Sequence, residues 1–193
     1  MRRLQAAGGA AIAIQEEPVE TGSKRRLRLL AVGIALAGVV LDQTTKTLAI
    51  AHLDPAAPVQ LLGGLLTLQL IRNPGAAFSL GEQFTVVFTF IAIGALIGVS
   101  GWLLPRVRHT GWAVATGCLL AGIVGNLIDR LFREPGAFHG HVIDFLQLPY
   151  FAIFNVADMF ITAAAVLVIW LSLITGVSVA GVRLKQAEKP ADG

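Results

Sequence analysis

The sequence predicts an all-α membrane protein, a bundle of four transmembrane helices with a small β-sheet on the extracytoplasmic side, and three observations predict this fold. First, 55% of the 193 residues are hydrophobic and only 14% are charged, whereas a soluble domain carries roughly 25% charged residues. Second, four apolar stretches are each long enough to cross ~30 Å of hydrocarbon, which takes ~20 helical residues. Third, the basic residues lie in short clusters beside these stretches, as they do in membrane proteins.

The four expected spans cover about residues 29–51, 84–104, 111–128 and 159–182. The first contains Asp42 and Lys46, and the other three contain no charged residue. Glycine and alanine are frequent in all four, and such small residues let helix backbones approach closely in a bundle. A chain of this length has room for one compact bundle, so we expect a single membrane domain over residues 27–182.

The basic residues predict the orientation of the chain. Eleven of the 15 lysines and arginines lie in residues 1–28, in the link between the second and third spans, or in the C-terminal tail. Three lie in the longer connections, residues 52–83 and 129–158, and the last is Lys46. Because cytoplasmic loops carry the excess of Lys and Arg, we expect both termini in the cytoplasm and both long connections outside. This placement also argues against a nucleic-acid partner, which needs a basic surface.

The two ends of the chain lie outside the expected membrane domain. We expect residues 1–26 to be a disordered cytoplasmic extension and residues 183–193 to be a cytoplasmic tail. The apolar run Ala6–Ile14 is short and is followed by acidic residues, which argues against a targeting peptide.

The long connections contain more than linker sequence. Residues 66–70, Leu-Thr-Leu-Gln-Leu, alternate as a half-buried strand does, and Asn73-Pro74-Gly75 follows as a turn signal. These residues predict the small sheet on the outer membrane face. The second connection contains Val142-Ile143-Asp144-Phe145, a short apolar run with one carboxylate in it.

Two polar pairs are expected near the outer membrane boundary. Asp42 and Lys46 share a helix face at i, i+4, and a charged pair within a span usually faces a site or cavity. The alternative is a simple pair at the interface, with Lys46 reaching out to the headgroups. Asn126 and Arg130 are also four residues apart. They point to the same site, unless they only complement the helix end and bond a neighbouring helix.

Two aspartates predict the chemistry. Asp144 lies in an apolar run, and Asp158 follows Asn155 by three residues, so that each alone could be structural; Asn155 and Asp158 fit a capping box. Two carboxylates brought together hold one proton between them, which lets one activate water while the other donates to a peptide carbonyl. We therefore predict an aspartic peptidase with Asp144 and Asp158 as its catalytic pair. His139, His141 and the single Cys118 are too few for a confident metal site, and no cofactor is expected.

Five sequence blocks resemble, in order, the motifs of the lipoprotein signal peptidase (signal peptidase II) family. The resemblance covers roughly residues 28 to 175, and five ordered blocks are far more specific than any one of them. One departure is Ala121-Gly122-Ile123, where the family often has Gly-Gly-Ala, which affects helix packing more than chemistry. The blocks are Asp42-Gln43-Thr44-Thr45-Lys46, Asn73-Pro74-Gly75-Ala76-Ala77-Phe78, Gly125-Asn126-Leu127-Ile128-Asp129-Arg130, Val142-Ile143-Asp144-Phe145 and Phe154-Asn155-Val156-Ala157-Asp158.

The resemblance implies a bacterial cell-membrane enzyme in which a four-helix bundle carries a small extracytoplasmic β-cradle. Its substrate would be a prolipoprotein whose cysteine already carries diacylglycerol, cut just before that cysteine at the outer face. Asp144 and Asp158 would be the catalytic dyad. The residues that support the dyad and hold substrate would be Asp42, Lys46, Asn73, Asn126, Arg130 and Asn155. Membrane lipid is the other expected partner, and the chain is expected to act as a monomer.

The sequence leaves two alternatives to the enzyme. A small transporter or channel would distribute ionisable residues through the depth of the membrane. A structural subunit would use its charges only to pair helices, so that single aspartate changes would damage folding before activity. The ionisable residues of this chain gather at the outer edge of the spans, which favours the enzyme.

Overall fold

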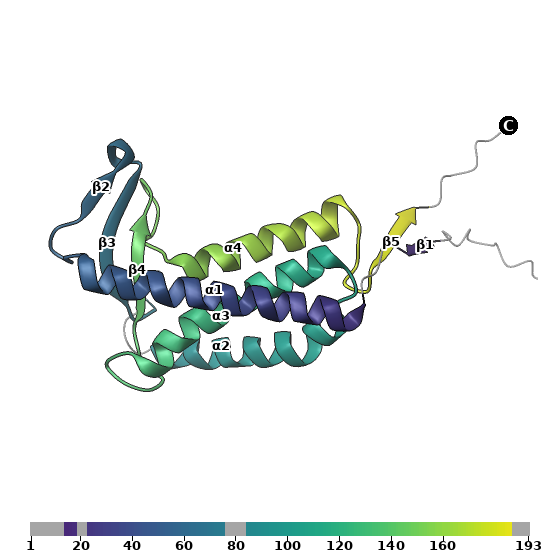
Figure 1. Cartoon of the computed structure of the whole chain (residues 1–193), viewed down its shortest axis with the longest axis horizontal. Helices are drawn as coiled ribbons and strands as arrows, with labels where there is room; N and C mark the ends of the chain where they lie inside the picture. Colours follow the sequence, from purple (N-terminus) through teal and green to yellow (C-terminus); the bar gives the residue numbers. More distant parts are fainter. Residues whose placement is uncertain (1–13, 19–22, 76–83, 187–193) are drawn as a thin grey trace, which may run out of the picture.

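The computed structural model of this protein describes residues 14–18, 23–75 and 84–186. Residues 76–78 of the second sequence block lie outside the described residues. Within the described residues, four helices are long and apolar enough to cross a membrane: Lys24–His52, Thr85–Arg106, Thr110–Phe132 and Val156–Ile174. They lie side by side as one bundle with a three-stranded sheet at one end (Figure 1). The predicted fold class is confirmed.

The first and third of these are continuous α-helices, α1 (Lys24–His52) and α3 (Thr110–Phe132). The other two change their pitch near their last turns. Helix α2 (Thr85–Gly98) continues through a π-helical turn, η3 (Val99–Leu103), and a 3₁₀ turn, η4 (Leu104–Arg106). Helix α4 (Val156–Ile169) continues through a second π-helical turn, η5 (Trp170–Ile174).

Helix α3 is the centre of the bundle. In its most apolar stretch 67% of the residues are buried, against 6–22% in the other three helices, whose exposed side chains are largely apolar and suit contact with lipid. Glycines allow this close packing. A Cβ atom on Gly122 would lie 2.5 Å from the Ala157 carbonyl oxygen of α4, and one on Gly125 would lie 2.6 Å from Asp42 Oδ2 of α1. Side chains at these positions would therefore push α1 and α4 away from α3.

The sheet has the strand order β2 (Val59–Leu61), β3 (Leu66–Asn73), β4 (Val142–Gln147), with both neighbouring pairs antiparallel. The strand predicted at residues 66–70 is confirmed. The turn after it is confirmed too, because Asn73 Oδ1 accepts a hydrogen bond from the backbone nitrogen of Gly75 at 2.8 Å, and Gly75 has a φ of 114°. The short apolar run around Asp144 was not predicted as a strand, and it forms β4.

The predicted position of the C-terminal end of the fourth span is wrong. We expected it to reach residue 182, but the helix ends at Ile174. The apolar composition continues beyond this point, whereas Gly176 adopts a left-handed φ of 63°, which ends the helix and turns the chain. The backbone carbonyl of Val177 then accepts a hydrogen bond from Trp112 Nε1 at 2.9 Å, and this bond ties the turn to α3.

The prediction of disorder over residues 1–26 is also wrong in part. Residues Ile14–Pro18 form strand β1, which pairs antiparallel with β5 (Val182–Gln186), and α1 already begins at Lys24. The register places Glu17 opposite Arg183. This two-stranded sheet lies at the end of the bundle opposite to β2, β3 and β4 (Figure 1).

Candidate active site

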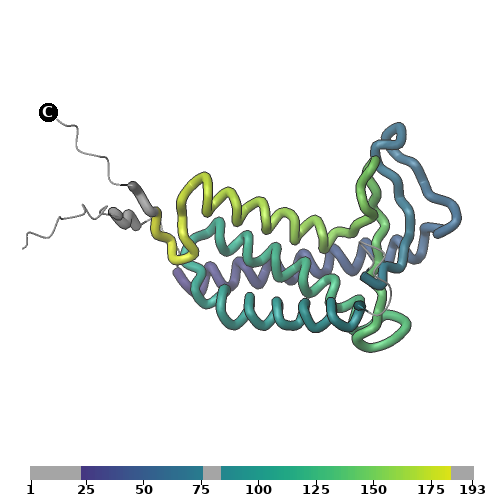
Figure 2. The backbone as a smooth tube through the Cα atoms, turned by 180° about the vertical axis from the view of Figure 1, so that it is seen from behind, coloured from purple at the N-terminus to yellow at the C-terminus, as the bar shows by residue number. Residues whose placement is uncertain are grey.

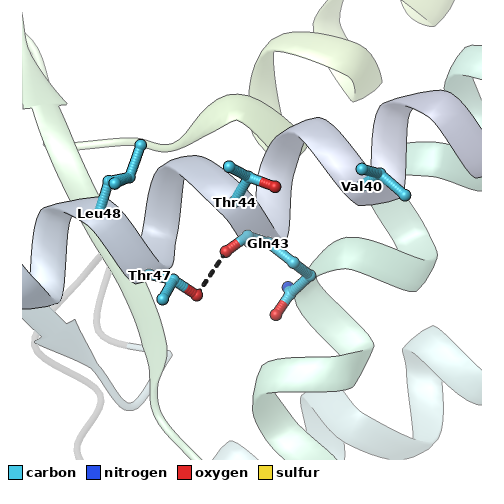
Figure 3. Close-up of a pocket in the computed structure, with 5 residues that line it drawn as sticks. All are labelled: Val40, Gln43, Thr44, Thr47 and Leu48. Carbon is cyan, nitrogen blue, oxygen red and sulfur yellow. Dashed lines mark hydrogen bonds between the residues drawn. The ribbon is translucent and has the colours of Figure 1, made fainter.

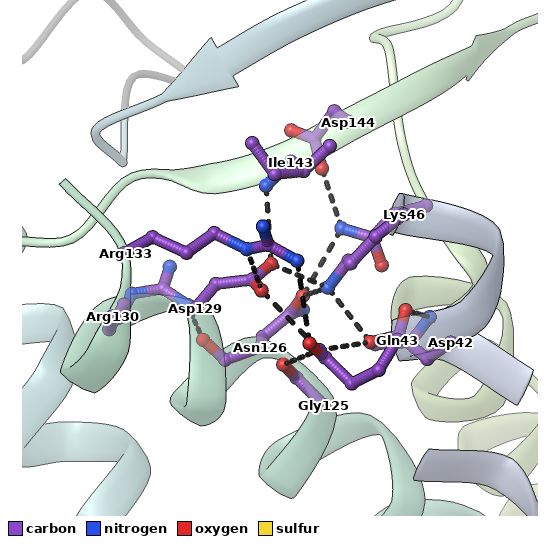
Figure 4. A network of polar contacts seen from close by, with 12 residues as sticks. Asp42, Gln43, Lys46, Gly125, Asn126, Asp129, Arg130, Arg133, Ile143 and Asp144 are labelled. Atoms are coloured by element: carbon purple, nitrogen blue, oxygen red, sulfur yellow. Dashed lines mark hydrogen bonds and ion pairs between the residues drawn. The ribbon is translucent and has the colours of Figure 1, made fainter. Parts of the chain in front are cut away.

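The eight residues predicted for the site gather where the three-stranded sheet meets the bundle. Figure 4 labels Asp42, Lys46, Asn126, Arg130 and Asp144 among them. They come from five elements, which lie far apart in the sequence. Helix α3 extends beyond the predicted span end at residue 128, and α4 begins before Asp158, so the polar residues of both lie within helices. Asp42 and Lys46 are on α1, Asn73 ends β3, Asn126 and Arg130 are on α3, Asp144 is on β4, Asn155 caps α4, and Asp158 is in its first turn.

Asp144 is buried at the centre of β4, with 3% of its surface exposed. Its carboxylate accepts hydrogen bonds from two asparagines: Asn73 Nδ2 donates to Oδ2 at 2.8 Å, and Asn155 Nδ2 donates to Oδ1. Burial raises the pKa of Asp144 to about 6; the two hydrogen bonds act against this rise, and the negative charge of Asp158 adds to it. Asp144 is therefore a carboxyl group that can hold a proton close to neutral pH.

Asp158 has two structural contacts of different kinds. The predicted capping box is confirmed, because Asn155 Oδ1 accepts from the backbone nitrogen of Asp158 and Asp158 Oδ2 accepts from the backbone nitrogen of Asn155. The other carboxylate oxygen, Oδ1, accepts from Asn126 Nδ2 at 2.8 Å. One side chain, Asn155, thus contacts both aspartates. A helix cap alone would not require the hydrogen bond between Asp158 and Asn126 of α3.

Asp42 and Lys46 form the predicted pair, with 2.9 Å between Lys46 Nζ and Asp42 Oδ2. Both side chains are fully buried, so the alternative in which Lys46 reaches out to the headgroups is wrong. Lys46 Nζ instead donates to Asn126 Oδ1 at 3.0 Å. Asp42 Oδ1 accepts from the backbone nitrogen of Ala157 at 2.9 Å, which ties α1 to the first turn of α4.

Arg130 is half-buried beside the aspartates, and at least one of its hydrogen-bond donors has no partner among the described residues. Its Nη1 donates to the backbone carbonyl of Asn126 at 3.3 Å. Within the part of the chain that the structure describes, its buried Nε has no hydrogen-bond partner. Because a buried polar group without a partner is costly, this donor suits an acceptor on a bound molecule.

Sequence reasoning missed three residues of this network, Gln43, Asp129 and Arg133. Asp129 is fully buried and pairs with Lys46 Nζ at 2.8 Å and with Arg133 Nε at 2.6 Å. Gln43 Nε2 bonds Asp42, Asp129 and the carbonyl of Gly125. The i, i+4 spacing of Asp129 and Arg133 was a signal, but ending the span at residue 128 placed both residues in a loop.

A groove of about 430 Å³ lies along α1 and is lined by Val40, Gln43, Thr44, Thr47 and Leu48 (Figure 3). Thr47 Oγ1 donates to the backbone carbonyl of Gln43 along this face. Gln43, which lines this groove, also belongs to the polar network. Among the described residues, no group of three or more His, Cys, Asp or Glu side chains is placed to hold a metal ion.

Comparisons with known proteins agree on one family. A family model described as Signal peptidase (SPase) II matches residues 34–174. The chain is 47% identical to the lipoprotein signal peptidase of Leifsonia xyli subsp. xyli over 163 residues, which cover 83% of this chain and 74% of that protein. It is 41% identical to that of Mycobacterium tuberculosis (strain H37Rv) over 167 residues, covering 86% and 79%.

Two solved structures are also similar. A bacterial membrane enzyme solved by the in meso method at 1.9 Å resolution has a TM-score of 0.66 and 28% sequence identity, covering 74% of this chain and 92% of that chain. A second such enzyme, solved at 2.3 Å, has a TM-score of 0.64 and 26% identity, covering 84% and 94%.

Proposed function

This chain belongs to the signal peptidase II family and is thus a multi-pass membrane peptidase, and we propose that it cleaves by an aspartic mechanism in which Asp144 and Asp158 are the catalytic pair. The observation that carries the proposal is that Asn155, whose Oδ1 accepts from the backbone nitrogen of Asp158 in the cap of α4, also donates from Nδ2 to the Asp144 carboxylate of β4. The raised pKa of Asp144 supports it, because one member of such a pair must hold a proton at working pH.

The proposed reaction uses the two carboxyl groups in opposite roles. The ionised carboxylate takes a proton from a water molecule, which attacks the peptide carbonyl carbon, while the protonated partner donates to the carbonyl oxygen. The tetrahedral intermediate then collapses as the carboxyl group that took the water's proton gives it to the leaving amine, and a hydroxyl of the intermediate returns its proton to the other carboxylate. The shared proton belongs to the coupled pair, and burial favours its residence on Asp144.

The supporting residues have distinct proposed tasks. Asn73, Asn126 and Asn155 donate to the two carboxylates and hold their orientation. Asp42 and Lys46 hold Asn126 and the first turn of α4. Arg130, whose Nε lacks a partner among the described residues, donates to a carbonyl oxygen of the substrate.

The proposed substrate is a prolipoprotein that carries diacylglycerol on its cysteine, cut just before that cysteine. The names of the relatives, lipoprotein signal peptidases, support this substrate. The test is to incubate the purified protein in detergent with a diacylglyceryl-modified preprolipoprotein and to follow release of the signal peptide by mass spectrometry. Release with a new N-terminus at the modified cysteine is expected. Cleavage elsewhere, or none at all, would contradict the proposal.

We further propose that the sheet end of the bundle faces the outside of the cell membrane and that both termini are cytoplasmic. The eleven-to-three excess of basic residues supports this orientation. Seen from behind, β2, β3, β4 and the loop after α3 lie at one end of the bundle, and the link between α2 and α3 lies at the other (Figure 2). Reporter fusions after residue 108 and at the C-terminus should report cytoplasm, and one near residue 70 should report the outside. A cytoplasmic signal from residue 70 would reverse the orientation.

A further inference from the structure

Asp129, near the end of α3, accepts hydrogen bonds from three different elements (Figure 4). Its Oδ2 accepts from Lys46 Nζ of α1 at 2.8 Å and from the backbone nitrogen of Ile143 in β4 at 3.2 Å. Its Oδ1 accepts from Nε of Arg133, the C-cap of α3, at 2.6 Å and from Gln43 Nε2 of α1 at 3.3 Å. A fully buried carboxylate with four donors is fully satisfied, and its partners can hardly move independently.

The first consequence concerns Asp144. Ile143 immediately precedes Asp144 in β4 and is itself completely buried, packed with Ala49, Leu70 and Phe145. The bond from its backbone to Asp129 is charge-assisted and ties the strand to the end of α3. The position of Asp144 relative to the bundle therefore depends on Asp129, which holds the residue that precedes Asp144 in the strand.

The second consequence concerns Asp158. Lys46 Nζ lies between the carboxylates of Asp42 and Asp129, and from there it donates to Asn126 Oδ1. This contact and the hydrogen bond that Asn126 Oδ1 accepts from Asn155 Nδ2 at 3.1 Å set the orientation of the Asn126 amide, because a flipped amide would point its NH₂ group at the ammonium. With the oxygen bonded to Lys46, Asn126 Nδ2 faces Asp158 Oδ1 at 2.8 Å.

We propose that Asp129 is a positioning residue that sets the separation of the Asp144 and Asp158 carboxyl groups. The two aspartates lie on β4 and α4, so neither element alone determines their distance. Asp129 acts on one through the Ile143 backbone and on the other through Lys46 and Asn126. The inference rests on the proposed aspartic mechanism, and it gives Asp129 a role without contact to the substrate.

The test is Asp129→Asn, with Glu134→Gln as the matched control. Glu134 lies five residues further along and loses the same charge, but its side chain is 89% exposed and pairs only loosely with Arg72 at 3.8 Å. In Asp129→Asn the amide cannot accept from all four donors, so Lys46 and β4 shift. We expect kcat per folded molecule to fall ~10²-fold, as for a misplacement of ~1 Å, with KM within about threefold of the parent. The control should retain the parent values.

The pH profile separates positioning from a merely structural role. The dependence of kcat/KM on pH should be bell-shaped, with an acidic and a basic limb. Removing the negative charge of Asp129 moves both limbs in the same direction along the pH axis. Moving the two carboxyl groups apart weakens their coupling, so the limbs also approach each other, by on the order of one pH unit. A variant that only folded poorly would leave the spacing of the limbs unchanged. Trp112→Phe, which loses a buried hydrogen bond at the opposite end of the bundle, provides that comparison.

A second variant, in which the buried charges stay balanced, separates positioning by Asp129 from loss of folding through an unpaired charge. Asp42, Lys46, Asp129 and Arg133 balance two negative against two positive charges, and Asp129→Asn/Arg133→Gln keeps that balance. If Asp129 served only charge balance, the double variant would regain kcat, and this result would overturn the proposal. Limb spacing or kcat per folded molecule equal to the parent in either variant would overturn it too. Failure of the parent to cleave lipidated substrate would instead refute the proposed function before any variant is made.

Discussion

Asp158→Asn should yield a folded protein that releases no measurable signal peptide. Asparagine at this position can still accept the backbone hydrogen bond from Asn155, so the cap of α4 should lose little stability. The amide cannot exchange a proton with water, and general acid–base assistance is worth ~10²–10⁴ in rate. The measurement is signal-peptide release by the purified variant, with membrane insertion and thermal stability recorded alongside. Near-normal turnover would make Asp158 a helix cap and remove it from the proposed pair.

Asp144→Asn should be equally inactive, and the double variant should be no worse than either single variant, because the two residues act as a unit. Thermal stability against pH shows whether this variant is folded. The raised pKa of Asp144, about 6 against an ordinary 3.8, means that the folded state binds an extra proton between these values. The stability contributed by protonated Asp144 is therefore fully present below about pH 4 and is lost, by on the order of 3 kcal/mol, as the pH rises through 6. Asp144→Asn should abolish this decline. Misfolding of both single variants would instead favour the structural-subunit alternative.

A peptide that lacks the diacylglyceryl group should be cleaved at least ~100-fold more slowly than the same peptide with it, since binding energy from a remote group can position the scissile bond. The surroundings of the site suit a lipid anchor. Leu48 on α1, Val87 on α2 and Met159 on α4 are each about half exposed at the sheet end of the bundle. A lipid tail can lie in hydrocarbon against such side chains while the peptide reaches the aspartates.

The comparison needs matched peptides that differ only at the cysteine, assayed in the same detergent or vesicles. A peptide with a single acyl chain is an informative intermediate, because its rate should lie between the two. Equal rates for the peptides with and without lipid would refute lipid anchoring but would leave the aspartic mechanism standing.

Contacts between residues that are close in the sequence could be predicted from the sequence, because the geometry of a helix or strand determines which near neighbours share a face. The Asp42–Lys46 pair at i, i+4, the Asn155–Asp158 capping box and the alternating strand at residues 66–70 all follow from local periodicity. The four spans follow from apolar length. The end of the fourth helix could not be predicted in this way. The apolar composition continues past Gly176, and only the backbone conformation of Gly176 ends the helix.

What the sequence by itself determined is thus the membrane bundle, its small sheet, and the kinds of polar side chain gathered near the ends of the spans. Only the tertiary structure decided which of these side chains meet. Asn126 accepts from Lys46, which lies 80 residues earlier in the sequence, and Asn155 contacts Asp144 across the junction between sheet and bundle. The local sequence around Asp129 indicates only its i, i+4 partner Arg133 and not its contacts with α1 and β4. The four donors of Asp129 converge because α3 is central and glycines let α1 and α4 pack against it, a packing that no local pattern encodes.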